Sequence, residues 1–138
     1  ISKTFGYLFA MNRLVSFLWI LVGLTLLVWA TRIYNLLNDN EISNGERIWR
    51  FLVAVIFLLA SMAVIKVLVG SWRDRNIKNS FLVPAFCIWT VTFWIVRSVG
   101  ILIADHEAGF KLIHVCMAGV FILLALTVNR FKTMVSNI

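Results

Sequence analysis

Charged side chains are scarce in this chain of 138 residues, since only 14% are Asp, Glu, Lys or Arg while 62% are hydrophobic. Soluble domains are about half apolar and roughly a quarter charged. The mean hydropathy of +0.94 lies well outside the range of such domains. A water-soluble fold would have to expose most of its Leu, Ile, Val and Phe side chains, so the composition excludes one and indicates an integral membrane protein.

Acidic residues are scarcer than basic ones, with 6 against 13 and a net charge of +7. On a soluble protein this excess would suggest nucleic acid as a partner. Here the basic residues lie at the ends of apolar runs, where cytoplasmic anchoring and anionic lipid headgroups explain them. No stretch interleaves aromatic and basic residues across a polar surface. We therefore expect the lipid bilayer as partner, with bound lipid, and no nucleic acid.

One proline and seven glycines barely interrupt the chain, and four apolar runs stand out, at 14–31, 48–65, 81–96 and 112–128. Each has about the length of helix that crosses a ~30 Å hydrocarbon core, the third being slightly short. None alternates polar and apolar residues, as a β-barrel strand would. The sequence predicts an all-α membrane protein with four transmembrane helices, in a single domain over residues 1–138.

Polar connectors separate the four runs and carry predicted helix caps. Ser43 and Glu46 have the spacing of a capping box at the start of the second helix. Asp105 is the predicted N-cap of the fourth helix. Pro84 falls in the first turn of the third helix, where proline is tolerated because that turn donates no intrahelical hydrogen bond.

Basic residues are unequally divided between the two membrane sides. The side with the termini and the second connector, 71–80, carries eight: Lys3, Arg13, Lys66, Arg73, Arg75, Lys78, Arg130 and Lys132. The other side carries five, Arg32, Arg47, Arg50, Arg97 and Lys111, together with five of the six acids. The positive-inside rule places both termini in the cytoplasm. The predicted location is the inner (plasma) membrane of a bacterium.

The two halves of the chain resemble each other. With a shift of 65 residues, Thr25, Trp29 and Arg32 align with Thr90, Trp94 and Arg97. With a shift of 64 after the loop, the identities are Gly45, Ala54, Phe57, Leu59 and Val64 with Gly109, Ala118, Phe121, Leu123 and Val128. We predict a tandem repeat of a two-helix hairpin, about 13–70 and 80–134. Two-span repeats are parallel, unlike the inverted repeats of many carriers.

Charged residues within apolar runs are functional candidates because charge is costly in hydrocarbon. The repeat aligns Lys66 with Arg130 and Arg97 with Arg32, all at span ends, where long side chains reach the headgroups. Headgroup anchoring is therefore the favoured interpretation. The alternative is an outer polar cluster of Arg32 and Arg97 with nearby acids, namely Asp39, Glu41, Glu46, Asp105 and Glu107.

Only two histidines are available for a cofactor. His106 lies in a loop between Asp105 and Glu107, and His114 lies one to two turns into the fourth helix. Haem between helices needs two ligands at one depth, and adjacent loop residues cannot all converge on one ion without an unusual turn. His106 and His114 are weak candidates for cofactor binding, and no cofactor or metal site is predicted.

Six tryptophans are present, and four of them lie at span ends, where an aromatic belt explains them: Trp29, Trp49, Trp72 and Trp94. Trp19 and Trp89 lie deeper and are candidates for a contact between helices or with another protein. The two cysteines, Cys87 and Cys116, are separated in depth by more than ~10 Å and are not expected to form a disulfide.

No enzyme motif occurs in the chain. There is no acid pair within a span, no HExxH or GxSxG, and no Gly-rich phosphate loop. The hydroxyls within the spans, such as Ser61, Thr25, Thr90 and Thr127, are expected to bond back to their own helix or to bridge neighbours. We do not expect an enzyme.

Two resemblances to known families follow from these patterns. The tandem hairpin, with Gly45 opening the second helix and Arg73-Asp74 after it, resembles the YiaA/YiaB-type inner-membrane proteins over most of the chain. The stretch from Arg32 to Lys66 resembles the small membrane subunit of tripartite ATP-independent periplasmic transporters. The matching residues in that stretch are Arg32, Tyr34, Glu46, Arg50, Phe51 and Lys66.

The leading hypothesis is a non-catalytic accessory or scaffold subunit that packs with other membrane subunits or with copies of itself. The absence of mid-membrane charge, of a soluble domain and of a catalytic set motivates this hypothesis. The alternative is a small transporter, channel or transporter subunit that uses Arg32 and Arg97 with the outer acids as a vestibule. A third hypothesis is a redox-cofactor subunit that uses His106 or His114.

Overall fold

The computed structural model describes the backbone of residues 2–74 and 80–138 and the side chains of residues 2–70 and 80–138. These residues form four long helices: α1 (Ser2–Asn38), α2 (Asn44–Asp74), α3 (Leu82–Ile103) and α4 (Ala108–Asn137). All four are long and apolar enough to cross a membrane. The prediction of an all-α, four-helix membrane protein is confirmed, and no strand occurs within the described residues.

Each helix extends beyond its predicted apolar run at one end or at both ends. The second connector is correspondingly shorter than predicted, since α2 continues to Asp74. Arg75 and Lys78 lie outside the described residues, as do the side chains of Trp72 and Arg73.

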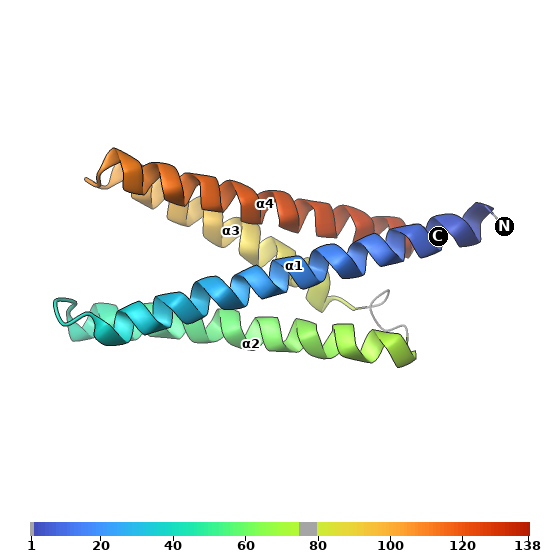
Figure 1. Cartoon of the computed structure of the whole chain (residues 1–138), viewed down its shortest axis with the longest axis horizontal. Coiled ribbons are helices and arrows are strands. Elements are labelled where there is room, and N and C mark those ends of the chain that lie inside the picture. The colour runs from blue at the N-terminus through green and yellow to red at the C-terminus, as the bar shows by residue number, and fades with distance from the viewer. Residues whose placement is uncertain (1, 75–79) are drawn as a thin grey trace.

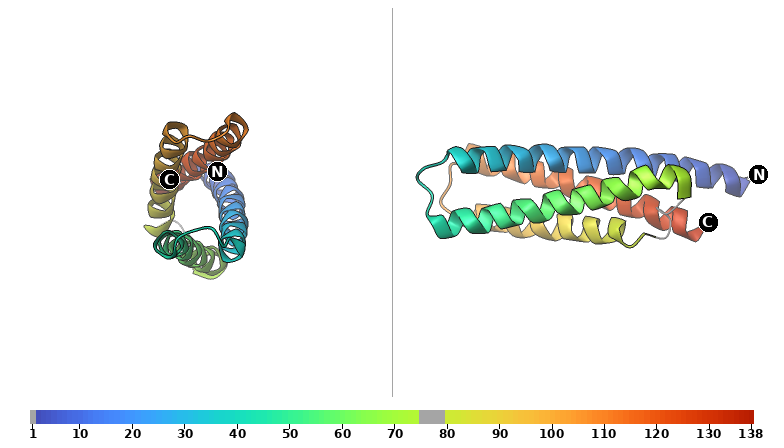
Figure 2. Two further views of the ribbon diagram at one scale, coloured as in Figure 1. Left: turned by 90° about the vertical axis from the view of Figure 1, so that its left-hand side faces the viewer. Right: turned by 90° about the horizontal axis from the view of Figure 1, so that it is seen from below.

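The helices run up and down in chain order, so that the two short connections lie at one end of the bundle (Figure 1). We call this the hairpin end; it carries residues 39–43 and 104–107. Both termini lie at the opposite, terminal end. Figures 1 and 2 show that the α1–α2 hairpin and the α3–α4 hairpin separate toward the hairpin end.

The interfaces between the two hairpins are unequal. Helix α1 packs extensively against α4, whereas α2 and α3 share few contacts. The main apolar core is built mostly from α1, α3 and α4 and includes the fully buried Leu14, Leu18, Val83 and Ala125. The consequence is a bundle that is closed along α1–α4 and loosely packed along α2–α3.

Each hairpin contains a stacked Trp–Phe pair. In the first hairpin the Trp29 and Phe57 ring centroids lie 4.5 Å apart at an interplanar angle of 15°. In the second, Trp94 and Phe121 lie 4.8 Å apart at 14°. The Phe93 ring joins the hairpins, since it meets Trp29 at 5.3 Å, Phe57 at 4.8 Å and Trp94 at 5.7 Å, each time edge-on. Such geometries add to the dispersion energy of the pairs.

The expectation that Trp29 and Trp94 belong to an aromatic belt is wrong. Their side chains are only 4% and 1% exposed. The physical reason is that each indole gains a stacked ring inside the bundle, a contact that the membrane interface does not provide. Trp49, by contrast, is 67% exposed.

The helix starts agree only in part with the predicted caps. The amide of Glu46 donates to Ser43 Oγ at 3.4 Å, as a cap should, but the Glu46 carboxylate pairs with Arg50. The prediction for Asp105 is wrong, because the N-cap of α4 is Glu107, with extended backbone and no side-chain cap. Extended backbone at Ala104 and Glu107 carries the chain past Asp105 before the helix starts. Pro84 lies in the first turn of α3, as predicted.

The predictions for the hydroxyl and thiol groups are also confirmed only in part. Thr25 and Thr127 donate to the carbonyls of Leu21 and Leu123, each at 2.7 Å, as expected. Ser61 and Thr90 are buried and their hydroxyls have no hydrogen-bond partner among the described residues, contrary to expectation. The cysteines, Cys87 and Cys116, are free, as predicted.

Truncating either stacked phenylalanine should destabilise the bundle. Phe→Ala in a soluble core costs ~3–5 kcal/mol, and because lipid is as apolar as the side chain, mainly the packing part applies in a membrane. We expect Phe57→Ala and Phe121→Ala each to lower the free energy of unfolding by about 2 kcal/mol, measured by denaturant titration in bicelles. The matched controls Leu59→Ala and Leu123→Ala remove side chains that are 62% and 67% exposed. Equal losses for controls and stack variants would contradict a structural role for the stacks.

Candidate functional site

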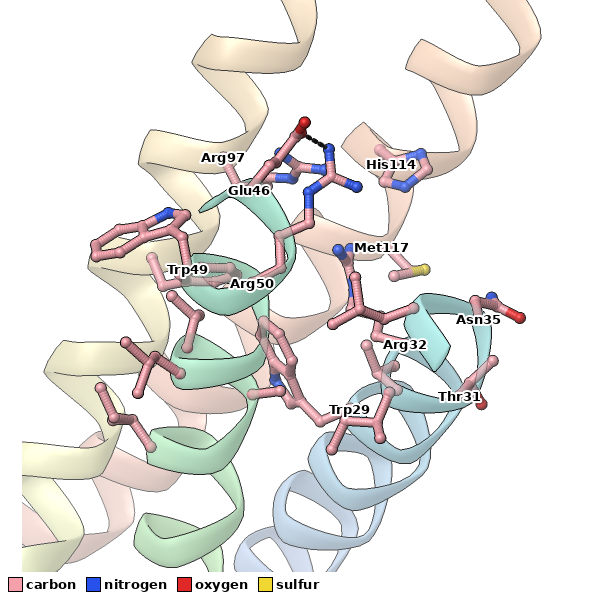
Figure 3. A pocket seen from close by; sticks show the side chains of 18 of the residues that line it. Trp29, Thr31, Arg32, Asn35, Glu46, Trp49, Arg50, Arg97, His114 and Met117 are labelled. Atoms are coloured by element: carbon pink, nitrogen blue, oxygen red, sulfur yellow. Dashed lines mark hydrogen bonds and ion pairs between the residues drawn. The ribbon is translucent and has the colours of Figure 1, made fainter. Parts of the chain in front are cut away.

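A cavity of about 1130 Å³ lies between the hairpins at the hairpin end. All four helices contribute residues to its lining, and Figure 3 shows the labelled side chains around it. Its polar lining residues lie near the hairpin end, and they are Thr31, Arg32, Asn35, Asp39, Glu46, Arg50, Arg97 and His114. Its deeper wall is apolar and aromatic, with Leu27, Val53, Ile56, Trp89 and Phe93 among the residues. The cavity is therefore amphipathic along the axis of the bundle.

Three arginines from three different helices point toward one another in this cavity, Arg32 from α1, Arg50 from α2 and Arg97 from α3 (Figure 3). The Arg50 guanidinium pairs with Glu46, one turn earlier on α2. The positive charges of Arg50 and Arg97 act unfavourably on Arg32. On Arg97 the charge of Arg50 acts unfavourably and that of the Glu46 carboxylate favourably. Such a cluster of like charges holds together only because the fold imposes it.

Arg32 is positioned by both hairpins. Its guanidinium carbon lies 5.3 Å from the ring centroid of Trp29 and 5.9 Å from that of Trp94. Cation–π contacts of this kind contribute roughly 0.5–2 kcal/mol, depending on desolvation. These contacts fix the Arg32 guanidinium above the two aromatic stacks, at the boundary between the polar and apolar parts of the cavity.

Arg97 is held differently. Its Nε atom is buried without a hydrogen-bond partner among the described residues. A buried donor without a partner costs free energy, of order 1–3 kcal/mol. In the ligand-free state the Arg97 Nε–H thus has no acceptor among the described residues.

The structure brings together four of the seven residues predicted for an outer cluster. Arg32, Arg97, Asp39 and Glu46 line the cavity. Glu41, Asp105 and Glu107 do not, because they lie exposed in the two connections at the hairpin end. Since both arginines point into the cavity (Figure 3), headgroup anchoring is the weaker interpretation for them.

Sequence reasoning did not single out Arg50 as part of the cluster. A signal was present, because the repeat aligns Arg50 with His114 and both line the cavity. The spacing of Glu46 and Arg50 by four residues also predicts an ion pair on one helix face. Rotation of α2 about its own axis, which decides where that face points, has no such local signal.

The two histidines both contact Phe110. The His114 ring lies 4.0 Å from the Phe110 ring, and its Nδ1 lies 2.9 Å from the Phe110 carbonyl oxygen. The His106 ring lies 4.7 Å from the same Phe110 ring, measured between centroids, and His106 is exposed. Only His114 lines the cavity. The described residues contain no group of three or more His, Cys, Asp or Glu side chains that could hold a metal ion.

Comparison with known proteins adds no assignment: no protein-family model, curated protein or solved structure matches this chain. The two family resemblances stay predictions. The argument for function therefore depends on the chemistry of the cavity.

Neutralising Arg97 should stabilise the ligand-free protein. Arg97→Gln removes a buried Nε without a partner and relieves repulsion with Arg50, so we expect the free energy of unfolding to rise by about 1 kcal/mol. The measurement is denaturant titration in neutral bicelles with chloride as the only anion. The control Arg130→Gln changes an exposed arginine of the terminal half and should be neutral. A clear loss of stability in Arg97→Gln would instead assign Arg97 a structural role.

Proposed function

We propose that this protein is a membrane binding protein for an anionic ligand, either on its own or as the small subunit of a transporter. The observation that carries the proposal is the convergence of Arg32, Arg50 and Arg97 in one cavity, with one ion pair among the described residues to compensate them. The proposal keeps the expectation of a non-enzymatic subunit and replaces the scaffold role by a binding role.

Arginine suits this role for physical reasons. A guanidinium group stays charged in any protein environment, and its planar fork binds carboxylate or phosphate oxygens with two hydrogen bonds. A cavity with apolar walls concentrates the field of such groups and raises the local concentration of anions. An anionic ligand would supply the acceptor that Arg97 lacks and would screen the repulsion between the arginines.

The depth of the cavity favours binding over conduction. Below the arginines, Trp29, Phe57 and Phe93 pack against one another, and the residues beyond them toward the terminal end form the apolar core. A continuous aqueous pathway would require polar groups at that depth. The geometry therefore supports a site whose opening to water lies at the hairpin end.

The duplicated hairpin is part of the proposal, and it accounts for the paired arginines. Two observations support the duplication. Each hairpin has a stacked Trp–Phe pair of nearly the same geometry. The aligned positions also share their burial, since Ala54 and Ala118 are both buried, as are Val64 and Val128. Equivalent positions at equal depth would bring Arg32 and Arg97 to one level of the membrane.

Iodide quenching of tryptophan fluorescence tests the proposed anion binding without knowledge of the natural ligand. Trp49 and Trp89 line the cavity and report on the anions there. A unit charge pair is worth ~1 kcal/mol at 4 Å in water, so we expect Arg32→Gln/Arg97→Gln to lower the iodide quenching constant about fivefold at constant low ionic strength. The protein is measured in neutral detergent.

Two controls accompany this experiment. Quenching by neutral acrylamide should be the same in both proteins, which shows that the cavity remains accessible. Arg13→Gln/Arg130→Gln removes the same number of charges outside the cavity and should leave iodide quenching unchanged. Identical iodide quenching in the wild type and the cavity variant would refute the proposed function.

We further propose that the protein lies in a bacterial inner membrane with both termini in the cytoplasm and the hairpin end outside. The excess of Lys and Arg on the terminal side supports this orientation. In a background without cysteine, a membrane-impermeant maleimide should label Asn40→Cys in intact cells and Asn137→Cys only after permeabilisation. The reverse labelling pattern would place the cavity on the cytoplasmic side.

A further inference from the structure

A second, smaller hollow lies along the loosely packed interface of α2 and α3. It has a volume of about 170 Å³, and its described lining is apolar or aromatic throughout, with Ile56, Ala60, Ala63, Val64, Leu82, Ala85, Phe86 and Trp89. We call it the α2–α3 groove. It shares Ile56 and Trp89 with the arginine-lined cavity. The groove therefore continues the apolar part of the cavity toward the terminal end.

The size and lining of the groove restrict its occupant. An ordered water needs two to four polar partners, and the groove lining offers almost none. A transmembrane helix is about 10–12 Å wide with its side chains, too wide for a hollow of this volume. A single hydrocarbon chain is both apolar and narrow. Small side chains at Ala60, Ala63 and Ala85 leave the space that such a chain requires.

The length of the combined site also fits a lipid chain. From Arg50 to Val64, α2 advances by about 21 Å at ~1.5 Å per residue. One leaflet accounts for about half of the ~30 Å hydrocarbon core. The cavity and groove together thus extend from the arginines through the depth of one leaflet.

The charge of the cavity specifies the head of such a ligand. Its lining holds three arginines, Arg32, Arg50 and Arg97, against two carboxylates, Asp39 and Glu46. These arginines and carboxylates together leave one positive charge. A ligand with a single negative charge would neutralise the site.

We propose that the ligand is a fatty-acid-like amphiphile, with its carboxylate at Arg32 and Arg97 and its acyl chain in the α2–α3 groove. This inference rests on the proposed function, because it assigns the ligand class of the same cavity. The continuity of the groove with the cavity, its apolar lining and the single excess positive charge carry the assignment.

Fluorescence quenching by 9,10-dibromostearate tests the inference, because bromine atoms quench only nearby indoles. In neutral detergent we expect saturable quenching, of which Trp89→Phe removes the greater part. Trp19→Phe is the matched control, since Trp19 lines neither hollow. The methyl ester of the same acid provides the uncharged probe, and its half-saturation concentration should be at least roughly tenfold higher, because it cannot form charged pairs with arginine.

A second variant tests the position of the chain. Ala85 is exposed at the groove, so Ala85→Leu fills the groove without entering the core. We expect it to raise the half-saturation concentration for dibromostearate at least fivefold while iodide quenching stays at the wild-type level. Ala30→Leu adds the same volume on an exposed part of α1 outside both hollows and should change neither measurement.

The possible outcomes separate the two proposals. Equal quenching by acid and ester, or quenching that Ala85→Leu does not affect, would overturn the acyl-chain inference while the iodide result keeps the anion site. Identical iodide quenching in the wild type and in Arg32→Gln/Arg97→Gln would overturn the proposed function as well. Tighter binding of a brominated phosphatidylglycerol than of the fatty acid would overturn the assignment to a single-chain carboxylate.

Discussion

The contact of Phe93 with both hairpins is the interaction on which the arrangement depends. Its ring meets Trp29 and Phe57 of the first hairpin and Trp94 of its own, so the hairpins are joined at this depth. Toward the terminal end, α1 and α4 close the bundle around apolar side chains. Toward the hairpin end, the arginines repel one another and the cavity occupies the space between the helices.

The position of Arg32 above the stacks links the packing to the chemistry. Because its guanidinium contacts a tryptophan of each hairpin, the relative placement of the hairpins also sets the distance between Arg32 and Arg97. A site built in this way needs no loop to order it. The binding groups lie on helices whose backbone hydrogen bonds are complete, which favours a preorganised geometry.

The features that could be predicted from the sequence are the local ones. The four spans follow from length and apolarity, the tolerance of Pro84 from its place in a first turn, and the Ser43 cap from its spacing to Glu46. The burial of Trp29 and Trp94 could not be predicted, because it depends on the rotation of each helix toward its neighbours. The convergence of the three arginines depends on the same helix rotations, which span length and hydropathy do not predict.

The unequal closure of the bundle has a consequence for access. A molecule that reaches the cavity through the loose α2–α3 interface arrives sideways, from the hydrocarbon, and need never dissolve in water. Its supply is then set by its partitioning into the membrane. Because the arginines lie near one end only, an amphiphile from the leaflet at that end enters in its existing orientation. One from the opposite leaflet would first have to turn over, so the bundle would distinguish the two leaflets by geometry alone.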